Sequence, residues 1–144
     1  MKKSFAIVVA SFHEKIAGSL LKACLAEFAR LGVKERSIEV VRVPGAFEIP
    51  VTALKLAGQK NIKAVVCLGA VIKGQTLHYE LVAQEAARGI MDVSLKTGKP
   101  VIFEVLAADT VALCQARAKD GDRDNKGASA ARAAVQTAAT LKVL

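Results

Sequence analysis

Residues 5–31 read FAIVVASFHEKIAGSLLKACLAEFARL and contain the unit from which the fold follows. The first six, Phe5–Ala10, form a continuous β-prone apolar run that predicts a buried strand. Ser11 and Glu14 have the spacing of a capping box, which predicts that a helix begins directly after this strand. Apolar residues then recur at helical spacing until Gly32, which is expected to end the helix. A buried strand followed at once by an amphipathic helix is the repeating unit of α/β folds.

The same alternation recurs along the rest of the chain. The further expected elements are strands at Ile38–Val43, Ala64–Leu68 and Val101–Leu106, and helices from about Glu48 or Pro50 to Gly58, His78 to Lys96, Thr110 to Lys119 and Lys126 to Leu141. Repeated alternation implies parallel strands joined by right-handed crossovers. We therefore expect a single domain, residues 1–144, of the α/β class. It is a three-layer α/β/α sandwich whose flavodoxin-like four-stranded parallel sheet has the order 2-1-3-4 and helices on both faces.

The positions of the loops in this fold predict where a ligand site lies. Ligands of open parallel sheets bind outside the carboxyl ends of the strands, where the strand order reverses. The expected loops at that edge are Ser11–His13, Pro44–Glu48, Gly69–His78 and Ala107–Asp109. In the order 2-1-3-4 the first and third of these loops flank the reversal point. Phe12 and His78 are thus expected on either side of one crevice.

Composition narrows the class of partner. The chain has 53% apolar residues but only 4% aromatic ones, so either the core is large or extra apolar surface is buried between subunits. The formal net charge is +8, but the basic residues are scattered, and the densest stretch, Arg117–Lys126, is interleaved with aspartates. Without a basic stripe or a stacking surface, nucleic acid is not expected as a partner. A phosphorylated small molecule suits such scattered positive charge better.

The cysteines and the hydropathy pattern point to the compartment. Cys24, Cys67 and Cys114 are odd in number, widely spaced and in apolar surroundings, which is typical of buried reduced thiols. No segment reaches the ~20 apolar residues of a membrane-spanning helix, and the apolar run after Met1 is too short for a signal peptide. We therefore expect no membrane partner and a cytoplasmic protein.

His78 is the expected proton-transfer residue. It stands in GAVIKGQTLHYE, where a Gly-flanked loop at the carboxyl edge of the sheet enters a helix. An imidazole exchanges protons near neutral pH, and the backbone N–H groups of Gln75 and Thr76 could hold an anion beside it. His13 is expected to be a solvated residue of a first helical turn. A cap hydrogen bond is the purely structural alternative for His78.

Aromatic and acidic residues near the same edge suggest a flat ligand. Phe47 and Glu48 follow a Pro-Gly turn, so an aromatic ring and a carboxylate lie side by side there. Phe12 and Phe103 lie at or near other strand ends. Together they suggest a planar ligand with hydroxyl groups, although each phenylalanine taken alone is typical of a core and Glu48 of a helix first turn.

No motif supports a metal or a nucleotide cofactor. The stretch Asp120–Ala131 resembles a calcium loop only superficially, since its sixth residue is Asn125 and its twelfth is Ala131 rather than Gly and Glu. Glycine-rich nucleotide motifs and metal-spaced Cys and His are lacking. Lys73 has the chemistry for a Schiff base but is expected to be a solvated loop residue.

Longer motifs carry a family resemblance. VPGAFEIP (43–50), LGAVIKGQTLHYE (68–80) and NKGASAA (125–131) look like the lumazine synthases, and the similarity runs in order over essentially the whole chain. The resemblance implies the penultimate step of riboflavin biosynthesis. In that step 5-amino-6-(D-ribitylamino)uracil condenses with 3,4-dihydroxy-2-butanone 4-phosphate, losing phosphate and water, without a cofactor.

The resemblance also implies roles for individual residues. The pyrimidine and its ribityl chain would be held by Phe12, Ala46, Phe47, Glu48, Ala70, Val71 and Ile72. The phosphate would be received by Gln75 and Thr76 with Arg117 as the charged partner, Lys126 would be a further substrate-binding residue, His78 would transfer protons, and Phe103 would reach a neighbouring subunit's site. The implied assembly is a homo-oligomer, a pentamer, with a larger shell left open.

Departures from the family pattern leave two alternatives open. The loop ARAKDGDRDNKG is about one residue longer than is typical, so Arg123 is the alternative phosphate partner to Arg117. Lys73 replaces a usual Arg, an Ala pair replaces a Thr pair at 107–108, and Glu104 replaces a usual Gly, which puts a carboxylate near the expected site. The alternative function is a catalytically reduced cage-forming or flavin-binding scaffold with the same fold.

Overall fold

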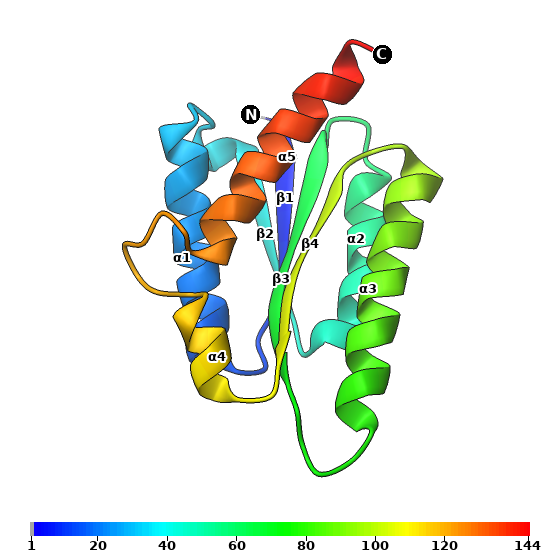
Figure 1. Ribbon diagram of the computed structural model, residues 1–144. Helices are drawn as coiled ribbons and strands as arrows, with labels where there is room; N and C mark the ends of the chain where they lie inside the picture. The colour runs from blue at the N-terminus through cyan, green and yellow to red at the C-terminus, as the bar shows by residue number, and fades with distance from the viewer. Residues whose placement is uncertain (1) are drawn as a thin grey trace.

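The computed structural model describes residues 2–144 and contains a parallel four-stranded sheet in the order β2-β1-β3-β4, with helices on both faces (Figure 1). The strands are β1 (Phe5–Ala10), β2 (Ile38–Val43), β3 (Ala64–Ile72) and β4 (Val101–Ala108). The α-helices are α1 (Glu14–Arg30), α2 (Ile49–Ala57), α3 (His78–Thr97), α4 (Val111–Ala116) and α5 (Lys126–Lys142), and the 3-10 helices are η1 (Glu35–Ser37) and η2 (Ala46–Glu48). The predicted three-layer α/β/α fold and strand order are confirmed.

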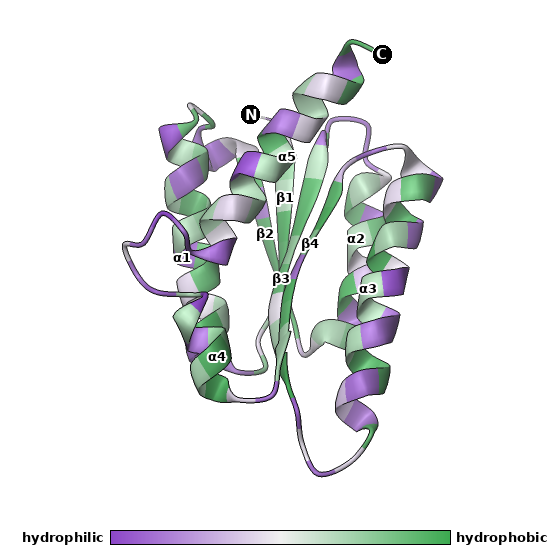
Figure 2. Cartoon of the chain, in the orientation of Figure 1, coloured by the Kyte–Doolittle hydropathy of each residue, from purple (hydrophilic) through white to green (hydrophobic). Residues whose placement is uncertain are grey.

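The sheet divides the core into two halves. Helices α1, α4 and α5 cover one face, and α2 and α3 cover the other (Figure 1). In β1 the side chains of Phe5, Ile7 and Val9 enter the first half, and those of Ala6, Val8 and Ala10 enter the second. All six residues are buried because β1 is an inner strand covered on both faces. This is why its sequence is a continuous apolar run, whereas the helices mix hydrophobic and hydrophilic residues (Figure 2).

The predicted capping box at the start of α1 is wrong. The N-cap residue is His13, with φ 58° and ψ 60°, and no side-chain hydrogen bond caps this helix. The cause lies in the preceding residues, where the N–H groups of Ser11 and Phe12 donate to the carbonyls of Val43 and Pro44. These bonds extend the pairing of β1 along β2, so the chain turns into α1 two residues later than Ser11. The chain changes direction at His13, whose backbone lies in the left-handed region that non-glycine residues rarely occupy.

Three other boundaries differ from the prediction. β3 continues past Leu68 to Ile72, and β4 continues past Leu106 to Ala108, because the two strands pair as far as Ile72 opposite Ala108. α4 spans only Val111–Ala116 and stops short of Lys119, while Thr110 caps it by accepting the N–H of Leu113 at 3.2 Å. Among the described residues, no helix combines the length and apolar composition needed to cross a membrane.

Candidate active site

A cavity of about 670 Å³ opens at the carboxyl ends of the strands. Its walls come from the β1–α1 connection, the turn and η2 after β2, the end of β3 and the first turns of α3. The lining residues are Phe12, His13, Pro44, Gly45, Ala46, Phe47, Glu48, Ala70, Val71, Ile72, Gly74, Thr76, His78, Tyr79, Leu81 and Val82. A largely apolar cavity with a few polar groups, of a size that suits a small molecule, is typical of a ligand site. We refer to it as the pocket.

Two phenylalanines present their rings to the pocket rather than to the core. Phe12 is 68% exposed and Phe47 is 61% exposed. The hydrogen bond from the N–H of Phe12 to the carbonyl of Pro44, at 3.1 Å, brings the first loop beside the second. His13 meets the Phe12 ring edge-on, with 4.7 Å between the ring centroids. Exposed aromatic rings cost hydration free energy, and a flat ligand stacked on them would recover it.

The end of β3 offers backbone groups to a ligand. The pairing of β3 with β1 ends at Leu68 opposite Val9, whereas its pairing with β4 continues to Ile72. Within the described residues, Ala70–Ile72 therefore have a strand partner on one side only. Buried backbone N–H and C=O groups require hydrogen-bond partners, so this free edge suits a ligand that carries amide groups.

Glu48 lies half-buried at the end of η2, with its carboxylate directed back toward the turn. A Cβ added at Gly45 would meet Glu48 Oε1 at 3.4 Å, so the glycine leaves room for the carboxylate. The N–H of Glu48 also donates to the carbonyl of Gly45 at 3.2 Å. Ala46 and Phe47, the other residues of η2, line the same wall. The turn therefore brings an acceptor for hydroxyl groups beside an aromatic ring.

His78 is exposed at the first residue of α3 and lines the pocket together with Phe12. Its backbone N–H donates to Thr76 Oγ1 at 3.3 Å. The N-cap residue of α3 is Leu77, whose own side chain makes no cap hydrogen bond. The start of α3 thus carries N–H groups that favour an anion, next to an imidazole that can exchange protons.

Four predicted site residues do not line the pocket of their own chain. These are Gln75, Phe103, Arg117 and Lys126. Phe103 is 43% exposed on the edge strand β4. Arg117 directly follows α4 and Lys126 begins α5, so they mark the two ends of the loop between these helices. Both helices cover the face of the sheet opposite to α2 and α3 (Figure 1). The N–H of Lys126 donates to the carbonyl of Arg117 at 2.8 Å. This bond holds the backbone of one basic residue next to that of the other.

Glu104 also lies on the side of the sheet that α1, α4 and α5 cover. Residues alternate across β4, so Glu104 shares a face with Ile102 and Leu106, which pack with the core under α1 and α5. Partial burial raises the pKa of Glu104, and the nearby Lys126 lowers it in part. The carboxylate therefore lies near the loop between α4 and α5 and is absent from the pocket lining. Among the described residues, no three His, Cys, Asp or Glu side chains gather closely enough to hold a metal ion.

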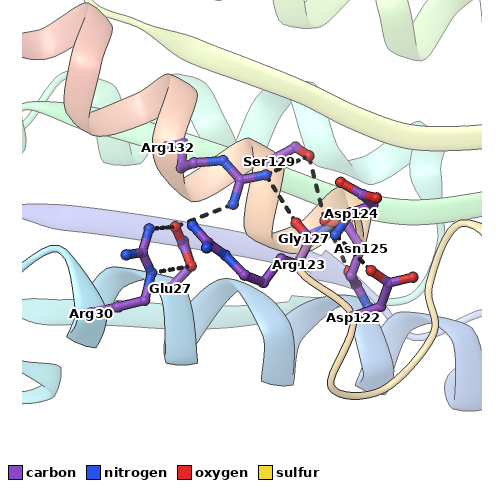
Figure 3. A network of polar contacts seen from close by, with 9 residues as sticks. All are labelled: Glu27, Arg30, Asp122, Arg123, Asp124, Asn125, Gly127, Ser129 and Arg132. Carbon is purple, nitrogen blue, oxygen red and sulfur yellow. Dashed lines mark hydrogen bonds and ion pairs between the residues drawn. The ribbon is translucent and has the colours of Figure 1, made fainter.

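A polar network joins α1 to the loop between α4 and α5 (Figure 3). Glu27 of α1 is 5% exposed and accepts hydrogen bonds from Arg30 and Arg132. Arg132 also donates to the carbonyl of Arg123 at 3.0 Å. The Arg30 guanidinium, and after it that of Arg132, lowers the pKa of Glu27 to about 2 against the opposing effect of burial. The side chain of Arg123 extends toward the same carboxylate (Figure 3).

Sequence reasoning missed part of the lining. His13 was expected to be solvated, yet it is half-buried in the pocket wall with an unusual backbone conformation. Tyr79, Leu81 and Val82 also line the pocket. Leu81 and Val82 follow His78 at spacings of three and four, which places all of them on one face of α3 and is a signal that could have found them.

Comparisons with known proteins agree over nearly the whole chain. A family model described as 6,7-dimethyl-8-ribityllumazine synthase matches residues 2–142. A 6,7-dimethyl-8-ribityllumazine synthase of Desulfotalea psychrophila is 45% identical over 143 residues, which cover 99% of this chain and 91% of the relative.

Proposed function

We propose, because this chain belongs to the 6,7-dimethyl-8-ribityllumazine synthase family, that it is an enzyme of riboflavin biosynthesis. It condenses 5-amino-6-(D-ribitylamino)uracil with 3,4-dihydroxy-2-butanone 4-phosphate. The amine of the pyrimidine adds to the carbonyl of the ketone, phosphate and water leave, and a second ring closes. The substrates are small molecules and the reaction class is group transfer.

The pocket suits the pyrimidine. Phe12, and Phe47 beside it, offer rings on which a flat heterocycle can stack. The free backbone edge at 70–72 suits the amide-like groups of the pyrimidinedione, because these present donors and acceptors in one plane. Glu48, with Ala46 at its side, is placed to accept hydrogen bonds from ribityl hydroxyls. The polar groups thus fix orientation while the apolar walls contribute most of the contact area.

His78 is the proposed proton-transfer residue. Amine addition and loss of phosphate both require protons to move, and an imidazole can give and take them near neutral pH. Thr76 and Gln75, just before the start of α3, would hold the phosphate beside it. The chain's contribution is to hold both reactants in one geometry and to move protons between them.

A neighbouring copy of the chain would complete the site. Phe103, Arg117 and Lys126 lie away from the pocket of their own chain but remain exposed. We propose that each pocket receives these residues from an adjacent subunit of a homo-oligomer, a pentamer that can form a larger shell. Exposed apolar residues on α3, such as Leu81 and Leu95, at 60% and 75% exposure, offer surface for such contacts.

Arg117 is the preferred phosphate partner. The carbonyl of Arg123 is held by Arg132, and its side chain extends toward Glu27 (Figure 3). Arg117 instead donates to the carbonyl of Leu113, in the preceding turn of α4, at 2.8 Å, and both arginines are exposed. A phosphate can replace that exposed backbone bond at little cost, because a charge-assisted bond is the stronger one.

The compartment and the domain boundary are proposed on the same basis. Cys24, Cys67 and Cys114 are unpaired and buried, and burial raises the pKa of all three thiols. Inert, reduced cysteines of this kind suit the cytoplasm. All four strands share one sheet, which supports residues 1–144 acting as a single domain.

The observation that carries the proposal is the exposed His78 at the start of α3, in a pocket that also presents Phe12 and Glu48. The test is the rate of lumazine formation, followed by absorbance, for His78→Ala and His13→Ala. We expect His78→Ala to lower kcat by about a hundredfold, because general acid–base groups contribute on this order. His13→Ala, the matched control in the same pocket, should change kcat by less than about fivefold. Equal losses of kcat in the two variants would contradict the role of His78.

A further inference from the structure

The loop 117–126, between α4 and α5, carries both of the cations assigned to substrate, at its two ends. Apart from Ala118 and Asn125, its residues are exposed. The buried side chain of Asn125 donates to the carbonyl of Lys119 at 3.0 Å and accepts the N–H of Gly127 at 2.8 Å. These contacts fix the C-terminal part of the loop. In the central part, Asp122 accepts the N–H groups of Asp124, at 2.9 Å, and of Asn125, at 3.1 Å, and one further contact comes from outside the loop.

Arg132 supplies that contact from the second turn of α5. Its Nη2 atom donates to the carbonyl of Arg123 at 3.0 Å and to Ser129 Oγ at 3.2 Å. Arg123 lies between the two ends of the loop, so a fixed carbonyl there limits the paths that the loop can take. A planar guanidinium can hold two acceptors at once in a defined geometry.

Glu27 in turn fixes Arg132. Nη1 of Arg132 donates to Glu27 Oε1 at 3.2 Å, across a sequence separation of 105 residues. Arg30 binds both oxygens of the same carboxylate, with Nε at 3.0 Å and Nη2 at 2.7 Å, but the contact between Glu27 and Arg132 is made directly. A continuous chain of contacts therefore runs from α1 through Glu27 and Arg132 to the loop (Figure 3).

We propose that Arg132, oriented by Glu27, is a positioning residue that sets the conformation of the loop 117–126 and thereby the placement of Arg117 and Lys126 for the phosphorylated ketone. The inference rests on the proposed function, since that function assigns the two cations to the substrate. Neither Glu27 nor Arg132 touches the pocket. Their effect is exerted through the loop, and it concerns one substrate only.

Arg30 provides a matched control within the same network. It binds the same carboxylate as Arg132 does, through two hydrogen bonds, but it makes no hydrogen bond to the loop. A purely structural ion pair would make Arg30→Ala and Arg132→Ala equivalent. A positioning role makes them different.

The experiment combines steady-state kinetics with hydrogen exchange of the peptide covering 117–127, for the wild type, Arg132→Ala, Arg132→Lys, Glu27→Gln and Arg30→Ala. We expect Arg132→Ala to raise KM for 3,4-dihydroxy-2-butanone 4-phosphate about five- to tenfold, while kcat and KM for the pyrimidine stay within about twofold. Its loop peptide should exchange faster. Arg30→Ala should leave all of these within about twofold.

The conservative variants keep the test informative if Arg132→Ala does not fold. Arg132→Lys keeps the charge without the planar fork, and Glu27→Gln keeps the shape without the charge, so both should lie between the wild type and Arg132→Ala. Equal KM changes in the Arg30 and Arg132 variants, or unchanged exchange of the loop, would overturn the proposal. Absence of turnover in the wild type would instead refute the proposed function, and hydrogen exchange alone would then decide whether Arg132 positions the loop.

Discussion

The pocket and the loop 117–126 hold their residues in opposite ways. In the pocket, Phe12 and His78 are exposed, and main-chain hydrogen bonds at the strand and helix ends position them. In the loop, main-chain bonds such as that from Lys126 to Arg117 are joined by contacts of long side chains, above all those of Arg132 and the buried Glu27. The pocket is therefore built from sheet geometry and is open to solvent, whereas the loop depends on contacts between segments far apart in the sequence. Side-chain substitutions should accordingly change binding in the pocket and conformation in the loop.

The largest effect is expected where the loop enters α5. A Cβ added at Gly127 would lie 2.0 Å from the carbonyl oxygen of Leu20, so Gly127→Ala must push α5 away from α1. We expect it to lower the free energy of unfolding by about 3 kcal/mol or more, because the obstacle is backbone and cannot rotate away. Gly18→Ala, on the partner helix α1, meets nothing within 4 Å and should stabilise by up to about 1 kcal/mol. Denaturant unfolding measures both, and a mild effect of Gly127→Ala would show that α1 and α5 are not in such close contact.

The pocket should show a loss of binding without a loss of stability. Phe12→Ala removes a ring that is 68% exposed, so unfolding should barely change, but KM for the pyrimidine should rise about ten- to a hundredfold through lost stacking. Phe28→Ala is the matched control, since Phe28 is fully buried and its loss should cost about 3–5 kcal/mol of stability. A strongly destabilised Phe12→Ala protein with unchanged KM would place Phe12 in the core instead.

A smaller effect should separate the two candidate phosphate partners. Arg117→Ala should raise KM for the phosphorylated ketone about tenfold, because it removes a charge-assisted hydrogen bond to phosphate. Arg123→Ala should raise it by less than about threefold, since the backbone carbonyl of Arg123, which Arg132 holds, is retained. Steady-state kinetics at varied ketone concentration decide the order. The reverse ranking would make Arg123 the phosphate partner.

The smallest effect concerns pH. Arg30 and Arg132 lower the pKa of Glu27 from 4.5 to about 2, so this carboxylate stabilises the folded state above pH 4.5, and the contribution is lost as the pH falls from about 4.5 to 2. Glu27→Gln should therefore destabilise by about 1 kcal/mol at pH 7, a modest value because the exposed side of Arg30 is screened by solvent. Below pH 2, where Glu27 is protonated in the folded state as well, the two proteins should unfold alike. Urea unfolding at several pH values measures this, and a pH-independent difference would count against the ion pair.

The same contrast explains what could be predicted from the sequence. Phe5–Ala10 is apolar on both faces because it is an inner strand, so the strand order and the placement of Phe12 and His78 at one edge follow from local pattern and general rules. The departures are local. Ser11 does not cap α1, because its N–H donates to the backbone carbonyl of Val43, a residue of another strand. Ala70–Ile72 joined β3 because β4 pairs with them.

The network around the loop could not have been predicted. Glu27 follows Cys24 by three residues on the buried face of α1, so its spacing indicates burial but not which cation pairs with it. That cation, Arg132, lies 105 residues away in an alanine-rich segment. Only the packing of α5 on α1, made possible by Gly127, brings the two together. Periodicity reports which face is buried, but a polar pair that spans two helices leaves no periodic signal.

The most direct test of the account is product formation by the wild-type protein supplied with both substrates. We predict that 6,7-dimethyl-8-ribityllumazine appears in its absorbance band and that one phosphate is released for each lumazine formed. If the protein instead binds 5-amino-6-(D-ribitylamino)uracil in the pocket but releases no phosphate and forms no lumazine, the enzyme function is contradicted. The chain would then be a binding scaffold with the lumazine synthase fold.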